Sequence, residues 1–378
     1  MPSVLAPLLD CVVGAIETAQ GPSGAVFHRT PATGRALLGE PRFDQMSATT
    51  SGVRIEALTD APEIELDVRL TVRLPRGTRP EGGGAFDAVV DGRLHEPEVV
   101  DTATVVVVDP ATGAEVERRE ADPVTVRFDL GRADGPRRVE IWFPASAALE
   151  LIDARVPEGA SLEPAPGGGP LWVHHGSSIS QCSEAERPTA TWPAIVARRS
   201  GHSLLNLGLG GQCHLDQFMA RTIRDLPADT ISLELGINVV NGDTMRLRTF
   251  VPAFHGFLDT VRDGHPETPI LVVTPIVCPA AEDRPGPTLL GPDGRVRTVD
   301  RPEPLADGAL SLGRIRELLH HHAAVRRESG DTRLHVVDGL DLFGPGDASA
   351  LPDGLHPDTD GYRRMAERFL DRALPVPR

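Results

Sequence analysis

The pattern of hydrophobic residues changes once along the chain, near residue 160, and this change limits the possible folds more than any other feature. Before that point apolar and polar residues alternate with a period of two, most clearly over residues 64–74. Such alternation is typical of a strand with one buried and one exposed face. Further strands are expected over residues 105–108, 124–130 and 139–143. Residues 1–160 are therefore predicted to form an all-β sandwich or jelly roll with a leading helix.

The second part of the chain follows a Pro- and Gly-rich segment at 161–170, which predicts a linker. Short apolar runs then predict strands at 171–174, 204–207, 230–235, 270–274 and 334–337. Helical stretches are expected at 192–199, 215–225, 250–262, 310–327 and 360–374. This alternation predicts an α/β domain over 171–378, with a parallel sheet covered on both faces. Ligands of such sheets bind at the carboxyl ends of the strands.

Glycine and polar residues follow three of the predicted strands. The first strand ends at Gly176-Ser177-Ser178, where a tight turn can expose a serine hydroxyl near the start of a helix. The second is followed by Gly208-Leu209-Gly210-Gly211, whose backbone N–H groups can approach a ligand closely. The third leads to Gly236-Ile237-Asn238, where an amide can donate to an oxyanion. Each segment alone also fits an ordinary turn.

A fourth segment, Asp353-Gly354-Leu355-His356, precedes the last predicted helix. An acid three residues before a histidine can accept the imidazole Nδ1–H and leave Nε2 free for a serine hydroxyl. A serine is a poor nucleophile without such a base. Together the four segments supply a nucleophile, an oriented base and oxyanion donors, at the edge where a parallel sheet would gather them.

The segments GSSIS, NLGLGG, GIN and DGLHPD, in this order, resemble the four signature blocks of the SGNH (GDSL-type) hydrolases. The resemblance covers the chain from about Leu171 onward and implies a flavodoxin-like three-layer fold. It implies Ser178 as the nucleophile, His356 as general base and then acid, and Asp353 as the residue that orients His356. The oxyanion donors that it implies come from Ser178, Gly211 and Asn238.

Two positions depart from the pattern of this family. Ser177 stands where the family usually has an aspartate before the nucleophile. Val239 stands where an aspartate commonly follows the asparagine. The resemblance therefore does not predict which hydrogen bonds support the nucleophile.

Several histidines and cysteines near the predicted site could imitate a zinc cluster. They are His174, His175, His214, Cys182, Cys213 and Cys278. Their spacing is irregular and includes no Cys-x-x-Cys pair, so no metal site is expected. The cysteines are interpreted as small packing residues around the pocket.

The formal net charge of −16 limits the partners of this chain. Such a surface repels nucleic acid and anionic membranes, so neither is expected as a partner. A polyanionic co-substrate such as coenzyme A would need a local cluster of arginines. The first twenty residues contain Asp10 and Glu17 but no basic residue, which argues against a signal peptide and for a cytoplasmic protein. They predict an amphipathic helix with an inner face of Leu5, Leu8, Leu9, Val12 and Ile16.

Acyl transfer to Ser178 leaves open which molecule receives the acyl group next. Resemblance to SGNH acyltransferases that tailor polyketide antibiotics implies an aryl acyl group moved from coenzyme A to a hydroxyl, with no other cofactor. The alternative is a GDSL esterase, such as a carbohydrate deacetylase with a sugar-binding β-domain, and a third hypothesis is a degenerate binding domain. The irregular insertion at 279–310 is either a lid or a surface insertion. The acyl group, the acceptor and the oligomeric state are not predicted.

Overall fold

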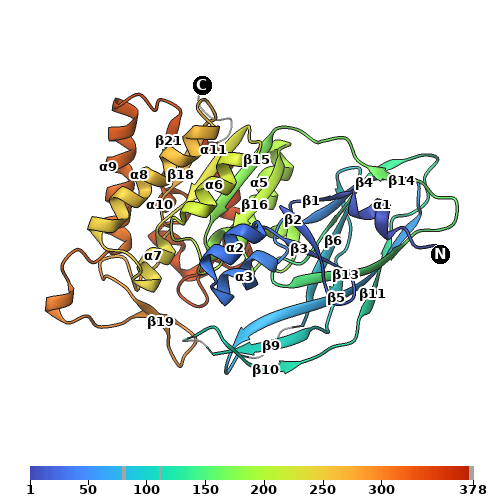
Figure 1. Ribbon diagram of the computed structural model, residues 1–378, viewed down its shortest axis with the longest axis horizontal. Helices are drawn as coiled ribbons and strands as arrows, with labels where there is room; N and C mark the ends of the chain where they lie inside the picture. The colour runs from blue at the N-terminus through green and yellow to red at the C-terminus, as the bar shows by residue number, and fades with distance from the viewer. Residues whose placement is uncertain (79–81, 110–111, 374–378) are drawn as a thin grey trace. The chain divides into compact units, whose positions relative to one another are not determined.

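The computed structural model describes residues 1–78, 82–109 and 112–373, which form two compact units (Figure 1). The first unit comprises the described residues of Met1–Gly168 together with Ala185–Thr189. The second comprises Gly169–Glu184 and the described residues from Ala190 onward. Residues 185–189 therefore group with the first unit, although the chain has already entered the second.

The first unit contains two sheets. One consists of β1 (Val12–Val13), β4 (Arg54–Thr59), β6 (Gly84–Val90), β7 (Arg93–Leu94), β8 (Glu98–Val100), β12 (Arg137–Trp142) and β14 (Leu162–Pro164). Its order is β1-β4-β12-β6-β7, with β14 paired to β4 and β8 paired to β6. All of these pairs are antiparallel.

The other sheet has the order β10-β9-β5-β13-β3-β2, with β11 paired to β5. Its strands are β2 (Glu17–Gln20), β3 (Ala25–His28), β5 (Glu63–Pro75), β9 (Thr104–Val108), β10 (Glu115–Arg119), β11 (Val124–Asp129) and β13 (Ala148–Arg155). The pair β5–β9 is parallel, so this sheet is mixed. One hydrophobic core contains buried residues of both sheets, among them Ile55 and Ile141 from the first and Leu66 and Leu151 from the second. The sandwich-like β architecture is confirmed at this level, while a jelly-roll connectivity stays a prediction.

Helices interrupt the first unit in places that the sequence pattern did not predict. The leading helix α1 spans only Leu5–Leu9, because the β-branched pair Val12–Val13 continues as a strand paired with β4. Two further helices, α2 (Ala32–Leu38) and α3 (Pro41–Ala48), lie between β3 and β4. The first unit is therefore not all-β. Proline precedes α2 and begins α3, which is a common way for a helix to start.

The second unit is built on a parallel sheet of five strands. They are β15 (Leu171–Gly176), β16 (Ser203–Gly208), β17 (Thr230–Glu234), β18 (Ile270–Val273) and β21 (Leu334–Val337). The order β16-β15-β17-β18-β21 is the 2-1-3-4-5 order of flavodoxin-like sheets. All five strands were predicted from their continuous apolar runs, and the structure confirms them. The strand order places the ends of β16, β15 and β17 side by side.

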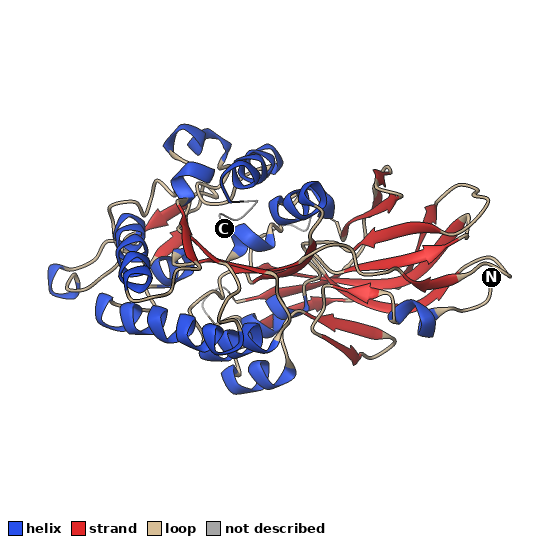
Figure 2. Cartoon of the chain, turned by 90° about the horizontal axis from the view of Figure 1, so that it is seen from above, coloured by secondary structure: helices blue, strands red, loops and turns tan. Residues whose placement is uncertain are grey.

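Helices cover both faces of this sheet, as Figure 2 shows in blue. They are α4 (Ser178–Gln181), α5 (Trp192–Ser200), α6 (Gln217–Asp225), α7 (Ile237–Gly242), α8 (Leu247–Gly264), α9 (Leu312–Glu328), α10 (Gly339–Leu342) and α11 (Thr359–Ala373). On one face Trp172 of β15 contacts Trp192 of α5 and Phe369 of α11. On the other face His175 stacks on Phe257 of α8. These side chains alternate along one strand, so the helices lie on opposite sides of it.

The insertion after β18 contains a short hairpin of β19 (Thr288–Leu290) and β20 (Val296–Thr298). Among the described residues, no helix is both long enough and apolar enough to cross a bilayer.

Candidate active site

Ser178 lies at the turn where β15 ends and α4 begins. Ser177 is the N-cap of α4, and its hydroxyl oxygen accepts the backbone N–H of Ile179 at 3.1 Å. Ser178 is half-buried, whereas both of its neighbours in the chain are fully buried. The turn requires glycine at 176, because a Cβ there would lie 2.2 Å from Ser180 Oγ. The local sequence therefore exposes one hydroxyl at the end of a buried strand.

His356 and Asp353 approach Ser178 from the loop before α11. His356 Nε2 lies 2.8 Å from Ser178 Oγ, and His356 Nδ1 lies 2.7 Å from Asp353 Oδ2. Asp353 Oδ1 accepts the backbone N–H groups of Leu355 and His356, both at 2.8 Å. The carboxylate is thus fixed by its own turn and directed at the imidazole. The structure brings together the three residues that the sequence predicted as a triad.

The charges around His356 favour its protonated form. Burial opposes ionisation of Asp353, but its hydrogen bonds to His356 and to the backbone lower its pKa to about 2. Burial also works to lower the pKa of His356, but the carboxylates of Glu184 and Asp353 outweigh it and raise that pKa. Glu184 Oε1 lies 3.9 Å from His356 Nδ1, and Glu184 Oε2 accepts the hydroxyl of Tyr362 at 3.0 Å. Two carboxylates therefore face the same imidazole.

The predicted oxyanion donors lie on loops that follow neighbouring strands. Gly211, after β16, has φ +69°, and its carbonyl accepts His214 Nε2–H at 3.0 Å. Asn238 is the second residue of α7, after β17, and is 4% exposed. Its Oδ1 accepts the backbone N–H of Cys213 at 3.0 Å, which leaves the NH₂ group of the amide to donate elsewhere. With Ser178 after β15, the three donors occupy adjacent strand ends.

This arrangement has the parts required for nucleophilic acyl chemistry. A base within hydrogen-bond distance can take the proton of Ser178 as its oxygen attacks a carbonyl. The carboxylate of Asp353 can stabilise the imidazolium that forms. Backbone and amide N–H groups can stabilise the negative oxygen of the tetrahedral intermediate.

The histidines and cysteines weighed as metal ligands are used in other ways. His174 Nε2 lies 2.8 Å from Ser180 Oγ, whereas His175 Nδ1–H donates to the carbonyl of Leu207 at 2.8 Å. The four cysteines are buried and free. Within residues 1–78, 82–109 and 112–373, no group of three or more His, Cys, Asp or Glu side chains is arranged to hold a metal ion.

Two acidic residues next to the site were missed by the sequence analysis, Glu184 and Glu234. Glu234 is the last residue of β17 and accepts hydrogen bonds from Ser177. A signal for it was present, because a charged residue inside a continuous apolar strand is rarely buried without a partner. Glu184 lies in a loop, and no local pattern marks it.

Comparison with known proteins places this site in a defined class. Residues 171–281 match the model of the GDSL-like lipase/acylhydrolase family. This segment contains the first four strands of the parallel sheet and Ser178, so the second unit is similar to GDSL-type enzymes. No curated protein sequence matches the chain.

Solved structures resemble the chain over both units. The salicylyl-acyltransferase SsfX3 from a tetracycline biosynthetic pathway is 27% identical, with a TM-score of 0.80 over 100% of this chain and 98% of that one. A protein of Bacteroides ovatus described as a GDSL-like lipase is 20% identical, with a TM-score of 0.67 over 95% and 93%. A family two carbohydrate esterase from Clostridium thermocellum, in complex with cellohexaose, is 16% identical, with a TM-score of 0.59 over 95% and 97%. The last two likenesses concern the fold alone.

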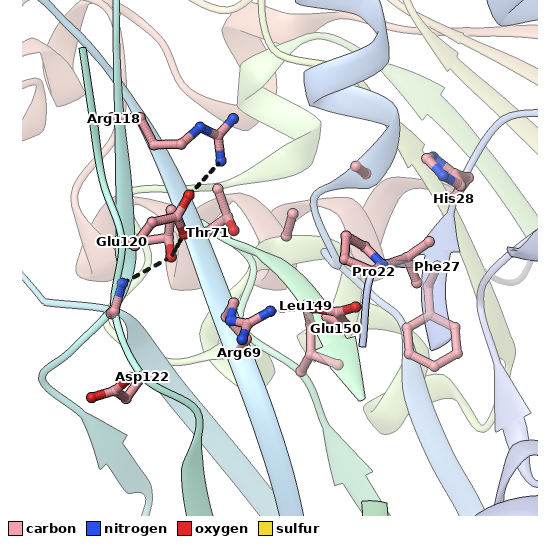
Figure 3. A pocket seen from close by; sticks show the side chains of 15 residues that line it. Pro22, Phe27, His28, Arg69, Thr71, Arg118, Glu120, Asp122, Leu149 and Glu150 are labelled. Atoms are coloured by element: carbon pink, nitrogen blue, oxygen red, sulfur yellow. Dashed lines mark hydrogen bonds and ion pairs between the residues drawn. The ribbon is translucent and has the colours of Figure 1, made fainter. Parts of the chain in front are cut away.

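A cavity of about 580 Å³ lies within the first unit (Figure 3). Four charged side chains in its wall form two ion pairs: Arg69 Nη1 with Glu150 Oε2 at 3.0 Å, and Arg118 Nη1 with Glu120 Oε1 at 3.6 Å. Apolar residues such as Leu149 complete the lining. The cavity therefore offers hydrogen-bond donors and acceptors beside apolar surface, and its volume suits a small molecule.

Proposed function

We propose that the chain is an acyltransferase that moves an aryl acyl group from a coenzyme A thioester to a hydroxyl of a polyketide-type natural product. The observation that carries this proposal is the likeness to SsfX3, which extends over both units at 27% identity. A match confined to the catalytic fold would favour no particular acceptor, because that fold serves many acyl reactions. A chain of this kind needs no further cofactor.

The geometry supports a two-step transfer. In the first step Ser178 Oγ attacks the thioester carbonyl and its proton passes to His356 Nε2. The C–S bond then breaks, and His356 returns the proton to the leaving thiolate. In the second step the acceptor hydroxyl gives its proton to His356 Nε2 and attacks the acyl-serine. The C–Oγ bond breaks, and His356 returns the proton to Ser178 Oγ. Ser178 N–H, Gly211 N–H and the Asn238 amide hold the carbonyl oxygen throughout.

An anionic acyl donor such as a coenzyme A thioester requires a positive group near the site, because the chain as a whole is acidic. Arg295, in the hairpin insertion, is exposed and forms no ion pair with any residue of the described ranges. Its Nη2 is 3.9 Å from the position that a Cβ on Gly354 would occupy, in the turn between Asp353 and His356. Val296 N–H donates to the carbonyl of Asp353 at 2.7 Å, so the hairpin is attached to the same turn. We propose that Arg295 binds the phosphates of coenzyme A.

Mass spectrometry of the intact protein tests this function. The chain is incubated with salicylyl-coenzyme A, with and without a hydroxylated tetracycline-type polyketide. The expected result is an acyl adduct on Ser178 that moves to the polyketide, and no adduct on Ser178→Ala. Arg295→Ala should raise KM for the coenzyme A thioester but not for the uncharged N-acetylcysteamine thioester. Arg297→Ala, in which the lost arginine was paired with Asp293, is the matched control.

The cavity of the first unit favours one second candidate, an esterase that acts on acetylated carbohydrate. Its paired arginines and carboxylates suit a hydroxylated ligand, although Phe27, the aromatic residue in its lining, is only 1% exposed and offers little stacking surface. This function predicts release of free acid from Ser178 with or without the polyketide. It also predicts that acetylated oligosaccharide is a better substrate than the thioester. An adduct that decays only to free acid would therefore replace the first proposal with the second.

A further inference from the structure

A buried carboxylate lies directly behind the nucleophile turn. Glu234 is 2% exposed, and its Oε2 accepts the backbone N–H of Ser177 at 2.7 Å and the Ser177 hydroxyl at 2.6 Å. The hydroxyl of Ser180 donates to the same oxygen at 3.3 Å. All three donors belong to the turn and first helical residues that surround Ser178. Glu234 therefore binds the segment that carries the nucleophile, and does so from the neighbouring strand.

The hydrogen bonds continue from Ser180 through the sheet. Ser180 Oγ lies 2.8 Å from His174 Nε2, and His174 Nδ1 lies 2.6 Å from Ser232 Oγ. The indole N–H of Trp172 donates to Ser232 Oγ at 2.7 Å. An indole can only donate, so Ser232 Oγ accepts from Trp172, and its own proton is available to His174 Nδ1. In that tautomer His174 Nε2–H donates to Ser180, whose hydroxyl donates to Glu234 Oε2.

This direction requires a neutral histidine and an acceptor oxygen on Glu234. Burial, with a smaller contribution from His175, lowers the pKa of His174 to about 3, so that its ring carries one proton. Burial raises the pKa of Glu234, while the hydrogen bonds from Ser177 and Ser180 act against that rise. Among the described residues Glu234 has no ion-pair partner, and the donors that oppose the rise of its pKa are all neutral.

The turn that carries Ser178 packs closely against Glu234 and against the end of β16. A Cβ on Gly176 would lie 2.8 Å from Glu234 Oε2, and a Cβ on Gly208 would lie 2.5 Å from the backbone N of Gln181. Contacts this short are open only to glycine. Helix α4 therefore packs directly on the ends of β15 and β16 and against the carboxylate of Glu234.

We propose that Glu234 is the positioning residue of the nucleophile: through Ser177 it holds the turn that keeps Ser178 Oγ at 2.8 Å from His356 Nε2. Ser177 thereby has a role that the sequence did not predict. A carboxylate from β17 bonds to its hydroxyl at the position where GDSL-type sequences usually carry an aspartate. This inference rests on Ser178 being the nucleophile of the proposed function.

The test is a steady-state and burst analysis with 4-nitrophenyl acetate, a small ester that makes few contacts beyond the reacting centre. Glu234→Ala should lower kcat and the burst rate by about 10²-fold with little change in KM, as expected for a nucleophile displaced by about 1 Å. Glu234→Gln keeps one acceptor oxygen and should retain most of the activity. Ser177→Asp alone places two carboxylates together and should also lose activity. The double variant Ser177→Asp/Glu234→Ala should recover at least about tenfold of the lost rate, because the carboxylate returns from the other side.

Asp60 supplies a matched control in the first unit. Its Oδ1 also accepts both the N–H and the hydroxyl of one serine, Ser161. Asp60→Ala should lower Tm and leave kcat unchanged. Wild-type kcat in a folded Glu234→Ala protein, or a double variant no better than either single variant, would overturn the inference.

A second variant covers the case in which Glu234→Ala does not fold. Ser177→Ala removes one hydroxyl and should lower kcat by about tenfold, the effect expected for loss of one hydrogen bond. Unchanged kcat in Ser177→Ala would then count against the inference. Ser178→Ala is measured in parallel, since wild-type hydrolysis that survives this change would overturn the proposed function and, with it, the role of Glu234.

Discussion

Two carboxylates lie near Ser178, Asp353 from the loop before α11 and Glu234 at the end of β17, and they differ in what they bind. Asp353 accepts two backbone N–H groups and the N–H of His356, and its side chain is 29% exposed. Glu234 accepts one backbone N–H and two hydroxyls, and is 2% exposed. The pKa of Asp353 falls to about 2, against the effect of its burial, because it bonds to a group that can be charged. The pKa of Glu234 rises through burial, since its donors are neutral.

In the proposed mechanism this difference separates Asp353, which acts in the transition state, from Glu234, which sets geometry. His356 becomes positively charged as Ser178 is deprotonated, so its attraction to Asp353 grows as the reaction proceeds. The donors to Glu234 keep the same charge at every step. Removal of Asp353 should therefore cost more rate than removal of Glu234, even though Glu234 is more deeply buried.

The largest expected effect is that of Asp353→Ala, which tests the difference between Asp353 and Glu234. We expect kcat on 4-nitrophenyl acetate to fall by about 10⁴-fold, as for the orienting acid of other serine triads. Some activity should remain, because Glu184 Oε1 lies 3.9 Å from the same His356 Nδ1.

Asp353→Ala/Glu184→Ala provides the control, and it should fall further than Asp353→Ala alone. If Asp353→Ala lost no more of kcat than Glu234→Ala, the proposed difference between the two carboxylates would be wrong.

The triad was predictable because each member lies in a short segment with its own local signal. Asp353 and His356 share one turn, and Ser178 follows a strand that its apolar run reveals. The buried carboxylate was not predictable in the same way. Glu234 reaches Ser177 because the register pairs His175 of β15 with Leu233 of β17, and the register of two parallel strands is not encoded in either strand alone.

Part of the fold was not predicted from the sequence, for a related reason. The strands of the first unit were predicted from a period-two alternation, and those of the second from continuous apolar runs. Helices α2 and α3 have seven and eight residues, and the buried residues of α3 include Gln45 and Ser47. Such short helices with polar buried positions show no clear apolar stripe. The position of Glu184 depends on its hydrogen bond with Tyr362, a residue distant in the sequence, so no local pattern predicts it.

A smaller effect is expected from Asn238→Ala, which tests whether the β17 side of the site also contributes to the transition state. Glu234 and Asn238 lie four residues apart, but only Asn238 has an NH₂ group that can donate to a developing negative charge. We expect kcat to fall by about 10²- to 10³-fold, the usual result of removing one oxyanion donor. KM for 4-nitrophenyl acetate should change little. A silent Asn238→Ala would show that Asn238 serves only to accept the N–H of Cys213.

The smallest effect concerns the pH at which His356 becomes a base. Burial lowers the pKa of His356, but the carboxylates of Glu184 and Asp353 raise it above the ordinary histidine value. The base must be neutral, so the acylation rate should fall as pH drops through this raised pKa. Glu184→Gln removes a negative charge that favours the imidazolium, and should move the acidic limb of the pH–rate profile to lower pH. The rate at alkaline pH should change little.

Stability should respond in the matching direction. The raised pKa of His356 stabilises the fold at low pH, where His356 is protonated, and this contribution is lost as pH rises through the folded-state pKa. Glu184→Gln should therefore lower Tm more at pH 5 than at pH 9. Unfolding scans of both proteins at the two pH values measure this. An acidic limb that stays in place, or moves to higher pH, would show that Asp353 alone sets the pKa of His356 and that Glu184 has no part in the site.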